Sequence, residues 1–226
     1  MCSSDLAGGT TWLPVGIGGP EAEPVGVDLF AGAHALLVSG PAGSGRTTAA
    51  AVVARGLRRA GIGVLALAPP RSPLPQLLPQ EDGVRVITGV SLKDEQLREA
   101  VVDFGDNPYA IVVDDANQLT VVAAKQGFGE APTLLEETAQ FTARGRAALV
   151  LTADATPILT GFPSPISRVL NSVVTNGSTL LLTPNSRAAA LAHHAALEPD
   201  QLFAGPPGRG YLLGGPDPTL LQVATV

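Results

Sequence analysis

A glycine-rich run in the first quarter of the chain carries the residue types that bind a polyphosphate. In order along the chain, it reads Gly40, Pro41, Ala42, Gly43, Ser44, Gly45, Arg46, Thr47, Thr48. It fits the phosphate-binding pattern G-x-x-x-x-G-K-[ST], in which glycines let backbone N–H groups surround the phosphates, the lysine reaches the β- and γ-phosphates and the hydroxyl binds Mg²⁺. Arginine holds the lysine position. We therefore expect residues 40–48 to bind ATP, with Thr47 as a ligand of Mg²⁺.

A pair of carboxylates further along the chain supplies the second part of such a site. Asp114 and Asp115 follow the apolar run Tyr109 to Val113, which predicts a buried strand. Ligands of open α/β sheets bind at the carboxyl ends of the strands. Asp114 is thus the second residue expected to hold Mg²⁺, through water, and Asp115 is the candidate catalytic residue that faces the attacking water. The alternative is an Asp-Asp turn that caps the next helix.

The elements around the glycine-rich run have the order that a phosphate-binding loop requires. Residues 35–39 are an apolar run of strand length, and residues 48–59 form an alanine-rich helix with arginines in its last turns. A strand, the loop and a helix follow one another, as the pattern demands. A glycine-rich turn without a ligand remains the alternative.

The rest of the chain continues this alternation. We expect strands at 63–67, 84–88, 147–152, 178–183 and within 205–213 and 220–224. We expect helices at 94–102, 133–143, 165–170 and 187–197. The stretch 68–75 is too rich in proline for a helix and predicts a surface loop.

Alternating strands and helices predict an α/β fold, with a mostly parallel sheet and helices on both faces. This architecture brings residues 40–48, the two carboxylates and Thr152 to one edge of the sheet. Thr152 ends a strand and is a candidate sensor of the γ-phosphate, although a threonine at this place can also be a simple turn former. Asp154 is a weaker candidate for the same role.

Composition limits the classes of function. The 226 residues are 45% hydrophobic with mean hydropathy +0.27, which is enough for a substantial core in a single domain. The longest apolar stretches fall far short of the roughly twenty residues of a membrane span. A net charge of -6 and a pI near 5.0 argue against tight DNA binding by this chain alone. Arg55, Arg58 and Arg59 share one helix face, which we interpret as a solvated face.

Cysteine and histidine give no sign of a metal centre. The single Cys2 cannot form an internal disulfide, and the neighbouring His193 and His194 would point in different directions on a helix. The first residues show no signal peptide. Residues 1–10 read as a non-native or disordered start, and residues 11–226 as the domain.

The domain as a whole resembles the FtsK/SpoIIIE family of P-loop ATPases, and most closely the C-terminal ATPase modules of EccC-type proteins of type VII secretion. The resemblance spans about residues 12–226. The stretches that carry it are Leu13 to Gly18 with Pro24 to Leu29, Gly40 to Thr48, Ala68 to Leu74, and Pro207 to Gly210.

The resemblance implies a RecA-like P-loop NTPase domain that uses ATP and Mg²⁺. It also implies sister ATPase domains or ring neighbours, with a hexameric ring in a longer, membrane-anchored protein that moves DNA or drives protein export. The domain itself would lie in the cytoplasm without direct membrane contact. In an EccC-like protein, the export signal of a secreted protein would be a further partner.

The sequence departs from the family pattern at Arg46 and at Asp115, where DNA pumps of the family have glutamate. Both changes weaken hydrolysis more than binding, because a guanidinium fits the lysine pocket differently and aspartate is one methylene shorter. We therefore predict ATP binding with weak or absent hydrolysis, in a regulatory or assembly role. The alternatives are an active DNA-translocating motor and a nucleotide-free structural module. Candidate arginine fingers, with surface ion pairs as the alternative, are Arg168, Arg187 and Arg209.

Overall fold

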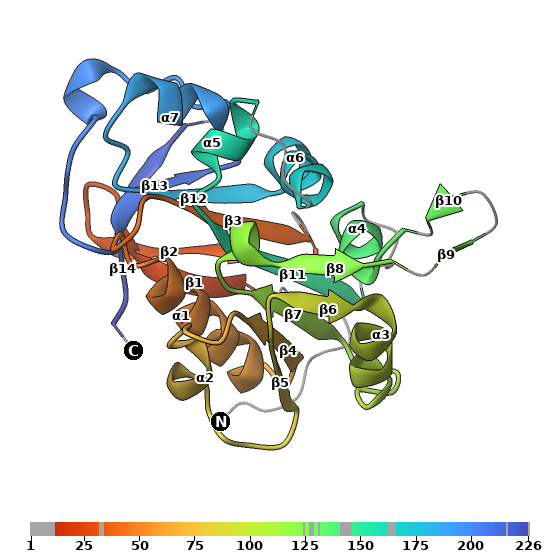
Figure 1. Cartoon of the computed structure of the whole chain (residues 1–226). Helices are drawn as coiled ribbons and strands as arrows, with labels where there is room; N and C mark the ends of the chain where they lie inside the picture. The colour runs from red at the N-terminus through yellow and green to blue at the C-terminus, as the bar shows by residue number, and fades with distance from the viewer. Residues whose placement is uncertain are drawn as a thin grey trace.

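The strand that leads into the glycine-rich run lies in the middle of a ten-stranded sheet (Figure 1). The computed structural model describes residues 12–31, 34–123, 125–126, 129–130, 132–140, 146–161, 166–215 and 217–225. Residues 1–10 and 141–143, which carry the expected non-native start and the end of one expected helix, lie outside these ranges, as does Pro165.

The strands of the main sheet are β1 (Trp12–Gly18), β2 (Glu23–Asp28), β3 (Ala35–Ser39), β4 (Gly63–Ala68), β5 (Val84–Thr88), β7 (Tyr109–Val113), β11 (Ala147–Ala153), β12 (Ser178–Leu182), β13 (Arg209–Leu213) and β14 (Thr219–Val223). Two small sheets pair β6 (Ser91–Lys93) with β8 (Thr120–Val122), and β9 (Lys125–Gln126) with β10 (Gly129–Glu130). The α-helices are α1 (Arg46–Arg59), α2 (Leu74–Leu77), α3 (Asp94–Val102), α4 (Leu134–Ala139), α5 (Thr156–Leu159), α6 (Ser167–Asn176) and α7 (Arg187–Ala192). Short 3₁₀ turns lie at η1 (Ala116–Gln118) and η2 (Pro199–Gln201). In the described part of the chain, no helix has the length and apolar character needed to cross a membrane.

The order of the strands is β2-β1-β14-β13-β12-β3-β11-β7-β4-β5. From β12 to β5 all neighbours are parallel, and from β12 to β2 all are antiparallel. The carboxyl ends of β3, β11 and β7 therefore meet at one edge, as expected from the alternation of strands and helices. The antiparallel half brings the start of β13 and the end of β14 to the same edge.

Helices cover both faces of the sheet, as predicted (Figure 1). One core packs α1 and α2 against residues such as Leu36 and Val38 of β3, and the other packs α3, α4 and α6 against residues such as Leu37 of the same strand. Successive side chains of a strand point to opposite faces, so a strand buried on both sides reads as an unbroken apolar run. A third cluster places α7 on β12 and β13.

The expected strands and helices are confirmed in kind, with shifted ends. Helix α1 begins two residues earlier than the predicted 48, at Arg46, and α7 stops at Ala192 rather than 197. The alternation is wrong for the antiparallel half of the sheet, where β1 and β2 form a hairpin that we had not expected. The sequence pattern typical of strands is weak in this hairpin because glycine and proline interrupt both β1 and β2.

The proline-rich stretch 68–75 is not simply a surface loop. It leads into the one-turn helix α2, whose Pro75 lies in the first turn, where the missing N–H has no intrahelical partner to lose. Ser72 and Leu74 are buried. Burial of this stretch turns Ser72 inward, toward the edge where the carboxylates lie.

The arginines of α1 are not a solvated face, apart from Arg59. The guanidinium of Arg58 donates to Glu81 and to the carbonyls of Ile62 and Asp82, and that of Arg55 donates to the carbonyl of Leu77. They tie the end of α1 to the segment between α2 and β5.

We expect Arg58→Ala to lower the free energy of unfolding by about 1–3 kcal/mol, because two backbone carbonyls lose a charged donor. Arg59→Ala, one residue further on the exposed face, should change it by less than about 0.5 kcal/mol. Urea unfolding of both variants measures the difference, and equal values would contradict the assigned role of Arg58.

Candidate phosphate and metal site

The glycine-rich run forms a tight loop between β3 and α1. Gly43 and Gly45 have φ angles of 79° and 94°, in the left-handed region that favours glycine. A Cβ at Gly40 would lie 2.7 Å from Oγ of Ser44 and 2.8 Å from the carbonyl oxygen of Leu182. The glycines are thus required by backbone shape, and the loop opens directly into the amino end of α1.

Asp114 is the centre of the site, with none of its surface exposed. Thr152 Oγ1 donates to its Oδ1 at 2.6 Å, and Ser72 Oγ donates to its Oδ2 at 2.6 Å. Thr47 Oγ1 lies 3.1 Å from both carboxylate oxygens. Strands β7 and β11, helix α1 and the segment before α2 therefore meet at one carboxylate.

Asp115 lies beside it and pairs with Arg46. Nη2 of Arg46 is 2.5 Å from Oδ1 of Asp115, while Nη1 donates to the carbonyl of Gly40. The two side chains are only 12% and 24% exposed. Asp115 has a φ of 44°, uncommon for a residue with a side chain, and its amide donates to Thr152 Oγ1 at 2.8 Å. The two positions that depart from the family pattern are therefore in direct contact.

These positions agree with the sequence prediction as far as proximity goes. Thr47, Asp114, Asp115, Arg46 and Thr152 come together at the carboxyl edge. Thr152 is fully buried. Its hydroxyl donates to Asp114 and accepts from the amide of Asp115, so both carboxylate residues bond it inside the protein. The alternative was an Asp-Asp turn that caps the next helix. The side chain of Asp115 does not cap η1, since it makes no cap hydrogen bond to that turn.

The donor set at Thr47 and Asp114 fits Mg²⁺. A hydroxyl and a carboxylate are hard oxygen donors, and Mg²⁺ usually takes one or two carboxylates and completes its shell with phosphate oxygens and water. Among the described residues, no group of three or more His, Cys, Asp and Glu side chains could hold a metal by itself. A metal at this site would therefore depend on phosphate oxygens.

Sequence reasoning missed two further contacts of the site, one to the loop and one to Asp114. The amide of Gly208 donates to the carbonyl of Ser44 at 2.7 Å, so the Pro207 to Gly210 stretch packs on the loop. Ser72 was missed because a serine among prolines reads as a turn residue. Ser72 and Gly208 both lie in stretches that carry the family resemblance, Ala68 to Leu74 and Pro207 to Gly210. That resemblance was the signal in the sequence that could have indicated a role for them.

His193 was interpreted as without function, and the structure gives it a contact behind the loop. Its Nε2 and Oγ of Ser39, the residue before Gly40, share a hydrogen bond of 2.9 Å. His193 is 4% exposed, and burial, helped by the charge of His194, lowers the pKa of His193 to about 4. This neutral imidazole connects the end of α7 to the end of β3.

The other candidates lie away from the two carboxylates. Asp154 lines a hollow of about 420 Å³ beside Gly40 and Pro41, between the ends of β11 and β12. Arg168, Arg187 and Arg209 are all exposed, and Arg168 lies 3.6 Å from Glu136. Among the described residues, the side-chain partners of Asp114 and Asp115 are other residues, so these three arginines do not take part in this site.

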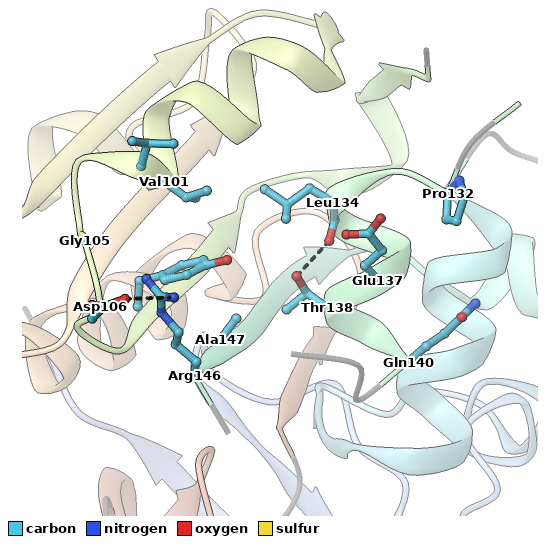
Figure 2. A pocket seen from close by; sticks show the side chains of 12 residues that line it. Val101, Gly105, Asp106, Pro132, Leu134, Glu137, Thr138, Gln140, Arg146 and Ala147 are labelled. Atoms are coloured by element: carbon cyan, nitrogen blue, oxygen red, sulfur yellow. Dashed lines mark hydrogen bonds and ion pairs between the residues drawn. The ribbon is translucent and has the colours of Figure 1, made fainter. Parts of the chain in front are cut away.

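A larger hollow of about 820 Å³ lies at the opposite edge of the sheet (Figure 2). It includes Tyr109 and Ala147, the first residues of β7 and β11, with Leu134 and Glu137 of α4. Arg146 pairs with Asp106 on its rim at 3.5 Å. The length of the parallel strands separates this hollow from the phosphate loop.

No protein-family model matches the chain, and no curated protein matches it. Solved structures do. EssC (ATPases 2 and 3) from Geobacillus thermodenitrificans superposes with a TM-score of 0.67 at 16% identity, over 96% of this chain and 42% of that one. Thermomonospora curvata EccC (ATPases 2 and 3) in complex with a signal sequence peptide gives 0.64 at 16% identity, over 99% and 42%. The pCW3 conjugation coupling protein TcpA, in a monomer form with ATPγS, gives 0.62 at 15% identity, over 97% and 71%.

These likenesses establish the fold. The chain has the α/β fold of the EssC and EccC ATPase domains, as the resemblance of its sequence stretches implied. It spans less than half the length of those EssC and EccC chains.

The packing of Gly208 on the loop can be tested with two glycine variants. A Cβ at Gly45 would lie 2.8 Å from the amide nitrogen of Gly208, while one at Gly43 would meet nothing within 4 Å. An alanine at either position is strained by the left-handed backbone, but only the one at position 45 also clashes with Gly208. We therefore expect Gly45→Ala to reduce the unfolding free energy by at least about 1 kcal/mol more than Gly43→Ala. Denaturant unfolding compares them, and an equal loss would show that the loop at 208 yields freely.

The buried imidazole predicts a pH dependence of stability. The pKa of His193 is lowered in the folded protein, so the unfolded chain binds the proton first as the pH falls. Its contribution is complete above the unfolded pKa near 6.5 and is lost toward pH 4, about 2 kcal/mol between pH 7 and pH 5. Thermal unfolding at a series of pH values measures how the free energy of unfolding depends on pH. The part of this dependence that comes from His193 should vanish in His193→Gln and persist in His194→Gln. A slope that persists in His193→Gln would exclude this histidine as its source.

Proposed function

We propose that this chain is an ATP-binding P-loop domain of an EccC-like ATPase, with weak or absent hydrolysis. The observation that carries the proposal is the contact between Thr47 and Asp114, each at the position where the phosphate-binding pattern requires a ligand of Mg²⁺. The loop that would surround the phosphates and the carboxylate that would face the metal lie on β3 and β7, with only β11 between them.

Each residue of the site has a role in this proposal. Backbone N–H groups of residues 40–48 bind the phosphates at the positive end of α1. Thr47 and Asp114 would hold Mg²⁺, which would neutralise negative charge on the phosphates. Ser72 and Thr152 keep the carboxylate of Asp114 in place, because each hydroxyl bonds one of its two oxygens.

Weak hydrolysis follows from the partner of Asp115. A residue that orients the attacking water needs an acceptor site that points to the water. Oδ1 of Asp115 already accepts from Arg46, and Oδ2 lies 3.3 Å from Nε2 of Gln118. These two contacts hold the carboxylate in one orientation and leave it fewer acceptor sites for a water molecule.

The wider role is inferred for a longer protein with several ATPase domains. The chain covers less than half of the EssC and EccC chains that it resembles, each of which comprises ATPases 2 and 3. We infer sister ATPase domains or ring neighbours as partners, and a regulatory or assembly role in protein export from the cytoplasmic side. A secreted protein's signal is a further partner by analogy with the EccC complex.

Calorimetric titration of Mg²⁺ and ATP into the purified protein tests the proposal, with phosphate release followed in the same samples. We expect binding in the wild type, at least tenfold weaker binding in Asp114→Asn, and unchanged binding in Asp106→Asn, which removes a carboxylate at the opposite edge. Release should be slow. Brisk release stimulated by DNA would favour a translocating motor instead, and no binding would leave a structural module.

A further inference from the structure

Arg46 is held by two acceptors of the protein itself. One terminal nitrogen contacts the carbonyl of Gly40, and the other contacts Oδ1 of Asp115 at 2.5 Å. Its Nε is buried and, among the described residues, has no hydrogen-bond partner. The charge at the lysine position of the pattern is thus neutralised within the chain.

A bound triphosphate needs the same guanidinium. In this pattern the cation reaches the β- and γ-phosphates, whereas the backbone amides of the loop surround the α- and β-phosphates. Asp115 supplies Arg46 with the kind of acceptor that a γ-phosphate oxygen would supply, because both are anionic oxygens that accept charge-assisted bonds. Two anions cannot approach one guanidinium nitrogen at hydrogen-bond distance without repelling each other.

We propose that Asp115 determines phosphate specificity: it competes with the γ-phosphate of ATP for Arg46, and so disfavours ATP relative to ADP. The inference rests on the proposed function. ADP has no γ-phosphate, so it can bind the loop while the pair of Arg46 and Asp115 stays closed. ATP brings the negative charge of its γ-phosphate against Asp115 at the same guanidinium.

The arrangement of the neighbouring carboxylate supports a competition at Asp115 in particular. Asp114 is fully buried and bonded by hydroxyl groups from Thr47, Ser72 and Thr152, so it has no part in holding Arg46. Asp115 is partly exposed and lies at the end of β7, with η1 beginning directly after it. Release from Arg46 would therefore move Asp115 and the start of η1, while Asp114 keeps its place.

The test measures the dissociation constants of Mg²⁺·ATP and Mg²⁺·ADP by calorimetry for the wild type and for Asp115→Asn. The amide keeps the size of the side chain and removes its negative charge. We expect ATP to bind about tenfold more tightly to Asp115→Asn, with less than about a threefold change for ADP. Asp106→Asn is the matched control, because it makes the same change from carboxylate to amide at the opposite edge of the sheet, where Asp106 pairs with Arg146. Its ratio of ATP to ADP affinity should stay within about twofold of the wild type.

A second substitution ties the effect to Arg46. In an Arg46→Gln background, Asp115→Asn should leave the ratio of ATP to ADP affinity unchanged, because the group for which the anions compete is gone. The same ratio change with and without Arg46, or an equal change in Asp106→Asn, would overturn the competition and point to general charge repulsion. If no variant binds either nucleotide, the proposed function fails and this inference fails with it. Thermal unfolding without nucleotide reports whether each variant is folded.

Discussion

The burial of one carboxylate organises the edge of the sheet that we assign to phosphate and metal. A charge without solvent exposure must have hydrogen-bond donors, since its desolvation is otherwise too costly. Asp114 finds them in Thr47, Ser72 and Thr152, which come from three different elements. Each donor is fixed in turn: Thr47 by the first turn of α1, Thr152 by β11 next to β7, and Ser72 by the turn before α2. The need of this one carboxylate for donors thus links the loop, Thr152 and the proline-rich segment at one place.

The antiparallel half of the sheet has a related task. Strands β13 and β14 add to the parallel block through β12, and the turn before β13 returns to the loop, where Gly208 bonds the carbonyl of Ser44. The two backbones approach so closely that a Cβ at Gly45 would lie 2.8 Å from the amide nitrogen of Gly208. Behind the loop, Ser39 and His193 join β3 to the end of α7. The phosphate loop is therefore supported by the last third of the chain as well as by its own strand and helix.

Sequence reasoning recovered the part of this arrangement that periodicity and spacing encode. Unbroken apolar runs gave the parallel strands, and the loop pattern with the paired carboxylates gave Thr47, Asp114 and Asp115 at one edge. It failed where tertiary contacts decide. The sequence of the β1–β2 hairpin has no clear alternation of apolar and polar residues. Ser72 points inward only because its loop is buried. Arg58 of α1 is bound because the carbonyls of Ile62 and Asp82 lie beside its guanidinium. The pairing of Arg46 with Asp115 joins residues that local patterns treat as separate signals.

That pairing changes the meaning of both substitutions. Considered singly, arginine in place of lysine is a bulkier phosphate ligand, and aspartate in place of glutamate is a shorter holder of water. In contact, they form a charge-assisted bond between a planar fork and a short carboxylate, a geometry that lysine with glutamate would not reproduce. The aspartate side chain is shorter than that of glutamate, and the arginine side chain is longer than that of lysine. The longer guanidinium side chain can therefore contact the shorter carboxylate. The two positions are therefore best treated as one coupled change, which leaves the backbone that we propose to bind phosphate and the proposed metal ligands intact and alters the charge that a terminal phosphate would meet.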